Sequence, residues 1–222
     1  MTRPSGMGSG APGRDCACCP RLVSFREHWR ALEPEWFNAP VDSFGPADAR
    51  LLVLGLAPGL RGANRTGRPF TGDYAGDLLY ATLIDFGFAR GTYAARPDDG
   101  LELIDCRISN AVRCVPPENK PTPAEITTCR DFLVGTLKEM SKLAIVVALG
   151  RIAHETFVSA NGARRAQFPF GHGRAHKIGA LTLIDSYHCS RYNTNTGVLT
   201  PQMFRDVFAQ ARKMLEPSPA KV

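Results

Sequence analysis

The sequence predicts an α/β protein, a three-layer α/β/α sandwich in which helices cover both faces of a central four-stranded, mainly parallel sheet. Four short apolar segments are the strand candidates: 51–56, 101–108, 143–149 and 181–185. The first and third, LLVLGL and LAIVVAL, lack alternation of apolar and polar residues, which is typical of strands buried on both faces. Helical segments separate the strands, and this order favours a parallel sheet.

Five segments are predicted to form these helices: 22–32, 75–88, 121–142, 150–160 and 200–215. The third has a clear start signal. Thr122 suits the N-cap, Pro123 the first helical position, and Glu125 the return bond of a capping box. Thr200 and Pro201 give the last helix a similar start. The ends of the helices are therefore better defined by the sequence than their packing.

Residues 16–215 are predicted to form one domain, because no linker or internal repeat divides them. A hydrophobic share of 44% and a charged share of 22% in 222 residues match a globular protein and exclude wholesale disorder. The segments 1–15 and 216–222 are predicted to be disordered tails. The chain shows neither a membrane-spanning apolar run nor the apolar core of a secretory signal, so we expect a cytoplasmic protein without a membrane partner.

The charge balance favours an anionic partner. Lys and Arg total 27 against 21 Asp and Glu, which gives a net charge of +6. The stretch 151–191 alone holds six basic residues against two acidic ones. This local excess can be a solvated face, but its position beside the loop after the last predicted strand favours a surface that faces phosphates.

The chain has seven cysteines, and their odd number and a chain long enough to build its own core disfavour a disulfide framework, so metal or cluster ligation becomes the leading use for some of them. Two pairs stand out, Cys16-x2-Cys19 and the wide pair Cys114-x14-Cys129. Four thiolates are typical of a [4Fe–4S] cluster and also of structural zinc, while burial as plain hydrophobes is the alternative. The remaining cysteines are surplus to a four-ligand site: Cys18, Cys106 and Cys189.

The loop 55–73, GLAPGLRGANRTGRPFTGD, follows the first predicted strand, where ligands bind in parallel sheets. Its glycines permit close approach of the backbone to a ligand, its arginines suit phosphate, and Phe70 offers a stacking face. The loop has neither the P-loop nor the dinucleotide-binding spacing. A flexible surface loop is the alternative, which explains the glycines but not the dense Arg, Asn, Phe and Asp content.

The loop 187–197, YHCSRYNTNTG, follows the last predicted strand, and His188 is its candidate functional residue. A single histidine is often structural, but the position of His188 directly after a parallel strand favours a catalytic role. His172 and His176 in GHGRAH suggest a metal pair. Because a Gly-rich segment fixes no ligand spacing, we interpret it as a polar loop.

Four motifs together resemble one family: CACCPRLV at 16–23, the loop 55–73, ISNAVRCVPPENKPTP at 108–123, and YHCSRYNTNTGVLTP at 187–201. They occur in order over nearly the whole predicted domain. The chain is similar to the iron–sulfur uracil-DNA glycosylases, most closely the B-type (family 5) branch. The resemblance implies a [4Fe–4S] cluster on Cys16, Cys19, Cys114 and Cys129, structural rather than redox-catalytic.

The resemblance also implies a monomeric DNA repair enzyme of the bacterial cytoplasm and nucleoid. Such an enzyme extrudes uracil from duplex DNA and hydrolyses the N-glycosidic bond, leaving an abasic site. This branch tends to accept hypoxanthine, xanthine and ethenocytosine as well. No lysine is placed as a Schiff-base nucleophile, so we expect a monofunctional glycosylase. The alternatives are a catalytically weak nucleic-acid-binding module of the same fold and a hydrolase of free nucleosides or nucleotides.

Under this resemblance, Phe70 stacks on the extruded base, Asn110 bonds its Watson–Crick edge, and His188 stabilises charge at uracil O2. Backbone amides at Leu56, Ala57 and Gly59 help to position the base. Ala57 stands where other branches carry a polar residue, so Asn64, and after it Asp73, is the candidate for positioning water, with Asn110 able to share that task. The expected DNA contacts are Arg65, Arg68, Ser190, Arg191 and Tyr192, and ordering the loop is the alternative role for Arg65 and Arg68.

Overall fold

The computed structural model describes residues 11–216. Its main sheet has five strands in the order β4-β1-β5-β7-β6. Four strands run parallel, as predicted: β1 (Leu51–Gly55), β4 (Cys106–Asn110), β5 (Ile145–Leu149) and β7 (Leu181–Ser186). The register aligns Gly55 with Asn110, so the carboxyl ends of β1 and β4 lie side by side.

A fifth strand, β6 (Ala175–Ile178), pairs antiparallel with β7 at the edge of the sheet and was not predicted. It lies in the segment interpreted as a polar loop. A tight turn joins the two strands, and Gly179 takes the left-handed conformation there, with φ of 60°. The sheet is therefore mainly parallel, as expected, but has five strands rather than four.

The predicted strand at 101–108 is divided into two. Its first part, β3 (Glu102–Leu103), pairs with β2 (Ala89–Arg90) in a separate small ribbon. Asp105 interrupts the run with a left-handed φ of 52°, and its Oδ1 accepts a 2.8 Å hydrogen bond from the backbone nitrogen of Arg50. This interaction between distant segments ends one strand and starts β4, and no local pattern signals it.

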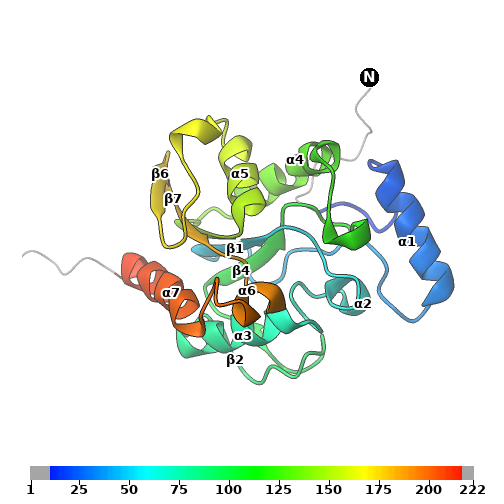
Figure 1. The fold of residues 1–222 in the computed structure, drawn as a ribbon, viewed down its shortest axis with the longest axis horizontal. Helices are drawn as coiled ribbons and strands as arrows, with labels where there is room; N and C mark the ends of the chain where they lie inside the picture. The colour runs from blue at the N-terminus through cyan, green and yellow to red at the C-terminus, as the bar shows by residue number, and fades with distance from the viewer. Residues whose placement is uncertain (1–10, 217–222) are drawn as a thin grey trace, which may run out of the picture.

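Helices cover both faces of the sheet, which confirms the three-layer architecture (Figure 1). On one face lie α3 (Tyr74–Asp85) and α7 (Pro201–Leu215), and on the other α4 (Pro123–Glu139) and α5 (Arg151–Ala160). Alternate residues of β1 enter the two cores. Val53 packs on the α3 side and Leu52 on the α4 side, and both are fully buried. Leu52→Ala would cost about 2–5 kcal/mol of unfolding free energy.

A separate helix, α1 (Pro20–Leu32), lies at one side of the molecule (Figure 1). It packs through Leu22 against Val112 and Phe132, in a third apolar cluster that also holds Cys114 and Cys129. Arg21 adds an ion pair with Glu125 of α4 at 2.7 Å. The N-terminal helix is thus attached to the rest of the domain mainly where the cysteines gather.

The predicted disordered tails fall mostly on residues outside the described range, at 1–10 and 217–222. Of the segment 1–15, the structure describes 11–15, where Asp15 forms a 2.7 Å ion pair with Arg30 of α1. Among the described residues, no helix has the length and apolar character needed to span a membrane.

Candidate active site

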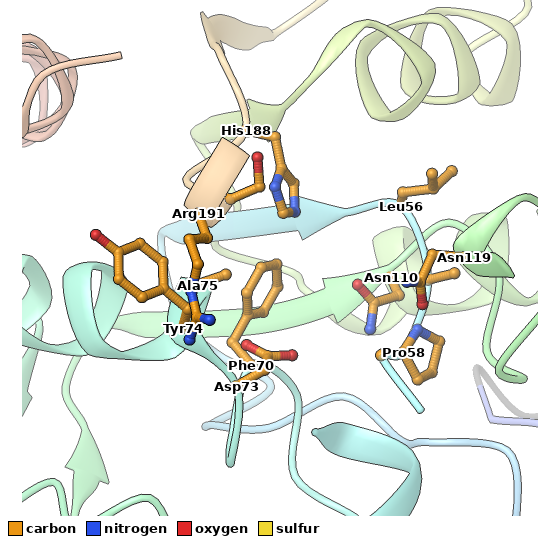
Figure 2. A pocket seen from close by; sticks show the side chains of 13 residues that line it. Leu56, Pro58, Phe70, Asp73, Tyr74, Ala75, Asn110, Asn119, His188 and Arg191 are labelled. Atoms are coloured by element: carbon orange, nitrogen blue, oxygen red, sulfur yellow. The ribbon is translucent and has the colours of Figure 1, made fainter. Parts of the chain in front are cut away.

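An open cavity of about 390 Å³ lies at the carboxyl edge of the parallel strands. Figure 2 shows the ring of Phe70, the imidazole of His188 and the amide of Asn110 around the same space. The walls come from the segment after β1, the loop before α3, the end of β4 and the loop after β7. The lining residues include Leu56, Ala57, Pro58, Gly59, Phe70, Asp73, Asn110, Asn119, His188, Ser190 and Arg191.

Asn110 is the last residue of β4, and its side chain is almost completely buried. Its Oδ1 has no hydrogen-bond partner in the described structure. A Cβ added at Gly55 would lie 2.4 Å from that oxygen and 2.6 Å from the Phe70 ring, so glycine is required for this packing. A buried acceptor without a donor costs about 1–3 kcal/mol, so the site is built to receive an N–H group.

Phe70 is held in a strained conformation, with a left-handed φ of 52°. Two tyrosines fix the backbone around it. Tyr93 donates to the carbonyl of Phe70 at 3.2 Å, and Tyr80 donates to the carbonyl of Pro69 at 2.6 Å. The Phe70 ring lies 6.1 Å from the imidazole of His188, centre to centre. The aromatic face is therefore held rigidly at the cavity wall.

His188 enters the cavity from the loop after β7. Burial lowers the pKa of its imidazole, so the ring is neutral near pH 7 and can donate one N–H to an oxygen. Its own carbonyl accepts a 2.8 Å hydrogen bond from Asn193 Nδ2, and the adjacent Cys189 thiol donates to the carbonyl of Ala75. These bonds fix the loop against α3.

Asp73 is the single acid among the described residues that line the cavity. It caps α3 by accepting a 3.3 Å hydrogen bond from the backbone nitrogen of Gly76. Its carboxylate packs on the backbone of the glycine loop, since a Cβ at Gly62 would lie 2.3 Å from Oδ2. Burial raises the pKa of Asp73, which makes the group a stronger base than an exposed aspartate.

Asn64 was expected near the reacting water, but another asparagine, Asn119, lies at the cavity instead. Asn64 is buried and donates from Nδ2 to Asn38 Oδ1 at 2.8 Å, and it is not among the residues that line the cavity. Asn119 does line it and was not singled out. It has a left-handed φ of 56° in a short 3-10 turn (Pro117–Asn119), a conformation that asparagine tolerates. The Pro-Pro-Glu-Asn turn between a strand and a helix is the sequence signal that could have pointed to Asn119.

Arg68, expected to contact phosphate or to order the loop, is a structural residue. Its side chain is 5% exposed and donates two hydrogen bonds to Asp99, at 2.8 and 2.7 Å. The guanidinium also lies over the rings of Phe44 and Tyr80. Arg68 therefore orders the loop rather than contacting phosphate. Its guanidinium also holds the pKa of Asp99 far below its usual range. Arg65, by contrast, is exposed.

The rim of the cavity is formed by α6 (Arg191–Asn195) and the start of α3. Ser190 caps α6 by accepting a 3.3 Å hydrogen bond from the backbone nitrogen of Asn193. The guanidinium of Arg191 lies 5.2 Å from the centre of the Tyr74 ring. Tyr192, 74% exposed, is more exposed than the other large hydrophobic side chain of this rim, Tyr74, at 37%.

The four expected ligand cysteines converge on one small cavity beside α1. Cys19 is the N-cap of α1, Cys129 lies in α4, and Cys16 and Cys114 complete the set. Two N–H groups point at sulfur: Arg26 Nη1 is 3.8 Å from Cys114 Sγ, and the backbone nitrogen of Arg113 is 3.3 Å from Cys129 Sγ. Cys18 also borders the cavity, whereas Cys106 and Cys189 are buried in the main core.

In the described residues, no three of these sulfurs lie within 4.8 Å of one another. Sulfurs on one tetrahedral zinc lie about 3.8 Å apart. Among residues 11–216, the one group of three potential ligands with all ligand atoms within 4.8 Å of one another is His154, His176 and Asp185, which contains no cysteine. An apolar shell, thiol-directed N–H groups and four thiols fit an iron–sulfur cluster.

The His154, His176 and Asp185 group is itself a buried hydrogen-bond network. Asp185 Oδ1 lies 2.6 Å from His154 Nδ1, and Oδ2 lies 3.1 Å from His176 Nε2. His154 Nε2 is 2.7 Å from the carbonyl of Phe168. His176 thus lies on a strand beside a carboxylate rather than in a polar loop. His172 does lie in the loop, where its Nδ1 accepts from the backbone nitrogen of Tyr187 at 3.0 Å.

A rigid aromatic face, a neutral imidazole and an unpaired amide oxygen around one cavity define a pocket for a planar heterocycle that carries a carbonyl beside an N–H. The family model of the uracil DNA glycosylase superfamily matches residues 43–212 of this chain. The chain therefore belongs to the uracil DNA glycosylase superfamily, as the resemblance predicted.

Its relatives place it in the type-5 branch. The type-5 uracil-DNA glycosylase of Thermus thermophilus is 44% identical over 206 residues, which cover 90% of this chain and 93% of the relative. The type-5 enzyme of Mycobacterium bovis is 43% identical, over 90% of this chain and 78% of the relative. That of Pyrobaculum aerophilum is 38% identical, over 89% and 88%.

Proposed function

We propose that this chain is a monofunctional DNA glycosylase that removes uracil from duplex DNA and leaves an abasic site. The observation that carries the proposal is the buried, unpaired Oδ1 of Asn110 in the cavity that Phe70 and His188 also line. An extruded uracil stacks on Phe70 and donates its N3–H to Asn110 Oδ1. The neutral imidazole of His188 donates to uracil O2, where negative charge grows as the glycosidic bond breaks.

In the reaction, the C1′–N1 bond breaks and its electron pair leaves with uracil as an anion stabilised at O2. The sugar carbon acquires oxocarbenium character and is attacked by the oxygen of a water molecule. Asp73 orients that water and accepts its proton, a role supported by its place on the cavity wall and by its raised pKa. Asn119, on another wall, is available to orient the same water.

The same cavity supports a graded range of damaged bases. Hypoxanthine and xanthine carry a carbonyl beside a ring N–H, so they offer the same donor to Asn110. Ethenocytosine lacks that ring N–H and relies on stacking against Phe70. The small side chain of Ala57 leaves the wall wide enough for larger rings. We therefore expect ethenocytosine to be the weakest of these substrates.

Duplex DNA would lie across the α6 rim. The exposed Tyr192 can fill the stack that the extruded nucleotide leaves, while Arg65, Ser190 and Arg191 face phosphates. The described residues that line the cavity include no lysine, which agrees with hydrolysis without a Schiff base. A monomer is sufficient for this mode of binding.

The cofactor we propose is a [4Fe–4S] cluster on Cys16, Cys19, Cys114 and Cys129, and when bound it supplies a structural cross-link. The cysteines bring α1, the segment after β4 and the first half of α4 to one point. The segment between Cys114 and Cys129 contains Asn119 and the cap of α4. A clamp at both ends of that segment would hold Asn119 at the cavity.

The proposal is tested with a labelled duplex that carries one G·U pair, followed by alkali, with the same duplex carrying G·C as control. We expect alkali-sensitive abasic sites only in the uracil strand. Asn110→Ala should lose most of this activity, while the matched control Asn161→Ala, at the end of α5, should keep it. Tight binding without abasic sites would support the nucleic-acid-binding module instead, and cleavage of free deoxyuridine alone would support a nucleoside hydrolase.

A further inference from the structure

Arg26 of α1 is a buried cation without a carboxylate partner. Its side chain is 2% exposed. Nη2 donates to the carbonyl of Cys16 at 3.1 Å, Nη1 lies 3.8 Å from Cys114 Sγ, and Nε has no hydrogen-bond partner. Asp15 is within electrostatic range, but its carboxylate is bound to Arg30 at 2.7 Å. In the described part of the chain, Arg26 forms no ion pair.

Such a cation needs a counter-charge. Removing a guanidinium from water without an anion costs several kcal/mol, so buried charges in proteins are paired or lie beside a metal centre. The neutral carbonyl of Cys16 does not provide that charge. The apolar neighbours Leu22, Val112 and Phe132 do not provide it either. The other lining groups are Pro12, Thr128, a second buried cation, Arg113, and the cysteine sulfurs. Among these, the sulfurs are the groups that can carry negative charge.

The surrounding helix has the same electrostatic bias. Cys19 is the N-cap of α1, where the helix dipole favours negative charge, and the first turn of α1 contains no acidic residue. A thiolate-ligated cluster in its oxidised state carries net negative charge, because four thiolates outweigh the core. A buried guanidinium and a helix N-terminus therefore face the same anionic group.

We infer that Arg26 is the counter-charge of the sulfur-ligated cluster, and that it raises the reduction potential of the cluster and slows its loss. The inference rests on the proposed cofactor. Reduction adds an electron to an already anionic group, so a nearby positive charge favours the reduced form. Charges and N–H donors next to the sulfurs are among the groups by which a protein tunes such a cluster.

The alternative is that Arg26 only ties α1 to the Cys16 carbonyl. Two substitutions separate charge from hydrogen bonding. Arg26→Gln keeps N–H donors and removes the charge, whereas Arg26→Lys keeps the charge on an ammonium group in place of the planar guanidinium. Arg30→Gln is the matched control, since Arg30 lies one turn along the same helix but pairs with Asp15 at 2.7 Å.

The experiment uses the holoprotein purified without oxygen. The reduction midpoint is measured by a redox titration followed by absorbance and electron paramagnetic resonance, and iron release is followed with a chelator. We expect Arg26→Gln to have a more negative midpoint and to release iron about tenfold faster. Arg26→Lys should return both values towards wild type, and Arg30→Gln should change neither.

The two levels of the proposal fail differently. Wild-type protein with no iron and no absorbance near 400 nm would overturn the cofactor itself. A wild-type cluster whose midpoint and iron release are unchanged in Arg26→Gln would leave the cofactor standing and overturn the role of Arg26. An equal shift in Arg26→Gln and Arg26→Lys would assign the effect to the geometry of the guanidinium contacts with Cys16 and Cys114 rather than to charge, and would overturn the inference.

Discussion

The base cavity and the cysteine cavity are built in opposite ways. The base cavity is open, about 390 Å³, and contains features that cost stability: an unpaired Asn110 oxygen, a strained Phe70 and a buried Asp73 with a raised pKa. The cysteine cavity is small and lined by apolar groups, cysteine sulfurs, a threonine and two buried arginines, Arg26 and Arg113. The first is prepared for a ligand that comes and goes, and the second for a group that stays.

The largest effect should separate the proposed ligands from the surplus cysteines. Cys129 and Cys189 are both buried, at 7% and 0% exposure. Cys129→Ala should lose nearly all iron and the absorbance near 400 nm, because it removes one of four ligands. Cys189→Ala should keep the iron, as should Cys18→Ala beside the cavity. Iron per mole of protein is the measurement, and full iron in Cys129→Ala would contradict the ligand set.

The next effect should be confined to the base cavity. His188→Ala removes the donor to the leaving base, and one such donor is worth roughly 3–4 kcal/mol of barrier, or about 10²–10³ in rate. Single-turnover excision of uracil measures this loss, while iron content should stay at the wild-type value. Asn64→Ala should lose far less, because Asn64 contacts Asn38 rather than the cavity. The reverse order would contradict the role of His188.

A smaller effect should link activity and stability at Asp73. Burial raises its pKa in the folded protein above the unfolded value, so the folded state binds this proton more tightly. The stabilisation that comes from binding this proton is therefore lost as the pH rises through the pKa of Asp73 in the folded protein. Asp73→Asn keeps an N-cap residue and removes the buried charge, so it should raise the melting temperature near neutral pH.

The same substitution should lower excision by about 10²-fold, since general-base catalysis contributes at least that much. In the wild type, activity should fall as pH decreases, at a pH above the usual range of an aspartate, and this limb should vanish in Asp73→Asn. An unchanged rate and acid limb would assign the water to another group, with Asn119 the first candidate.

The sequence predicted those parts of the molecule that depend on local pattern or on the family motifs. His188 follows an apolar strand segment, whereas Asn110 was named through a family motif, and both line the cavity. The sequence left two roles open for Arg68, because its partner Asp99 is 31 positions away and nothing local distinguishes a buried arginine from a phosphate-binding one. The burial of Arg26 and the place of Asn119 at the cavity were not predicted for the same reason, because both arise from packing between distant segments.

The smallest effect on DNA binding should separate two arginines of one loop. Arg65→Ala removes an exposed charge, so it should reduce the dependence of DNA affinity on salt by about one counterion and leave stability unchanged. Arg68→Ala breaks the buried pair with Asp99 and should cost about 3–5 kcal/mol of unfolding free energy. In the fraction that remains folded, it should leave the salt dependence of binding as it is. The salt dependence of DNA affinity and the free energy of unfolding are measured separately. A weaker salt dependence in Arg68→Ala with normal stability would show that Arg68 leaves Asp99 to contact DNA, and Arg68 would then count as a phosphate-binding residue.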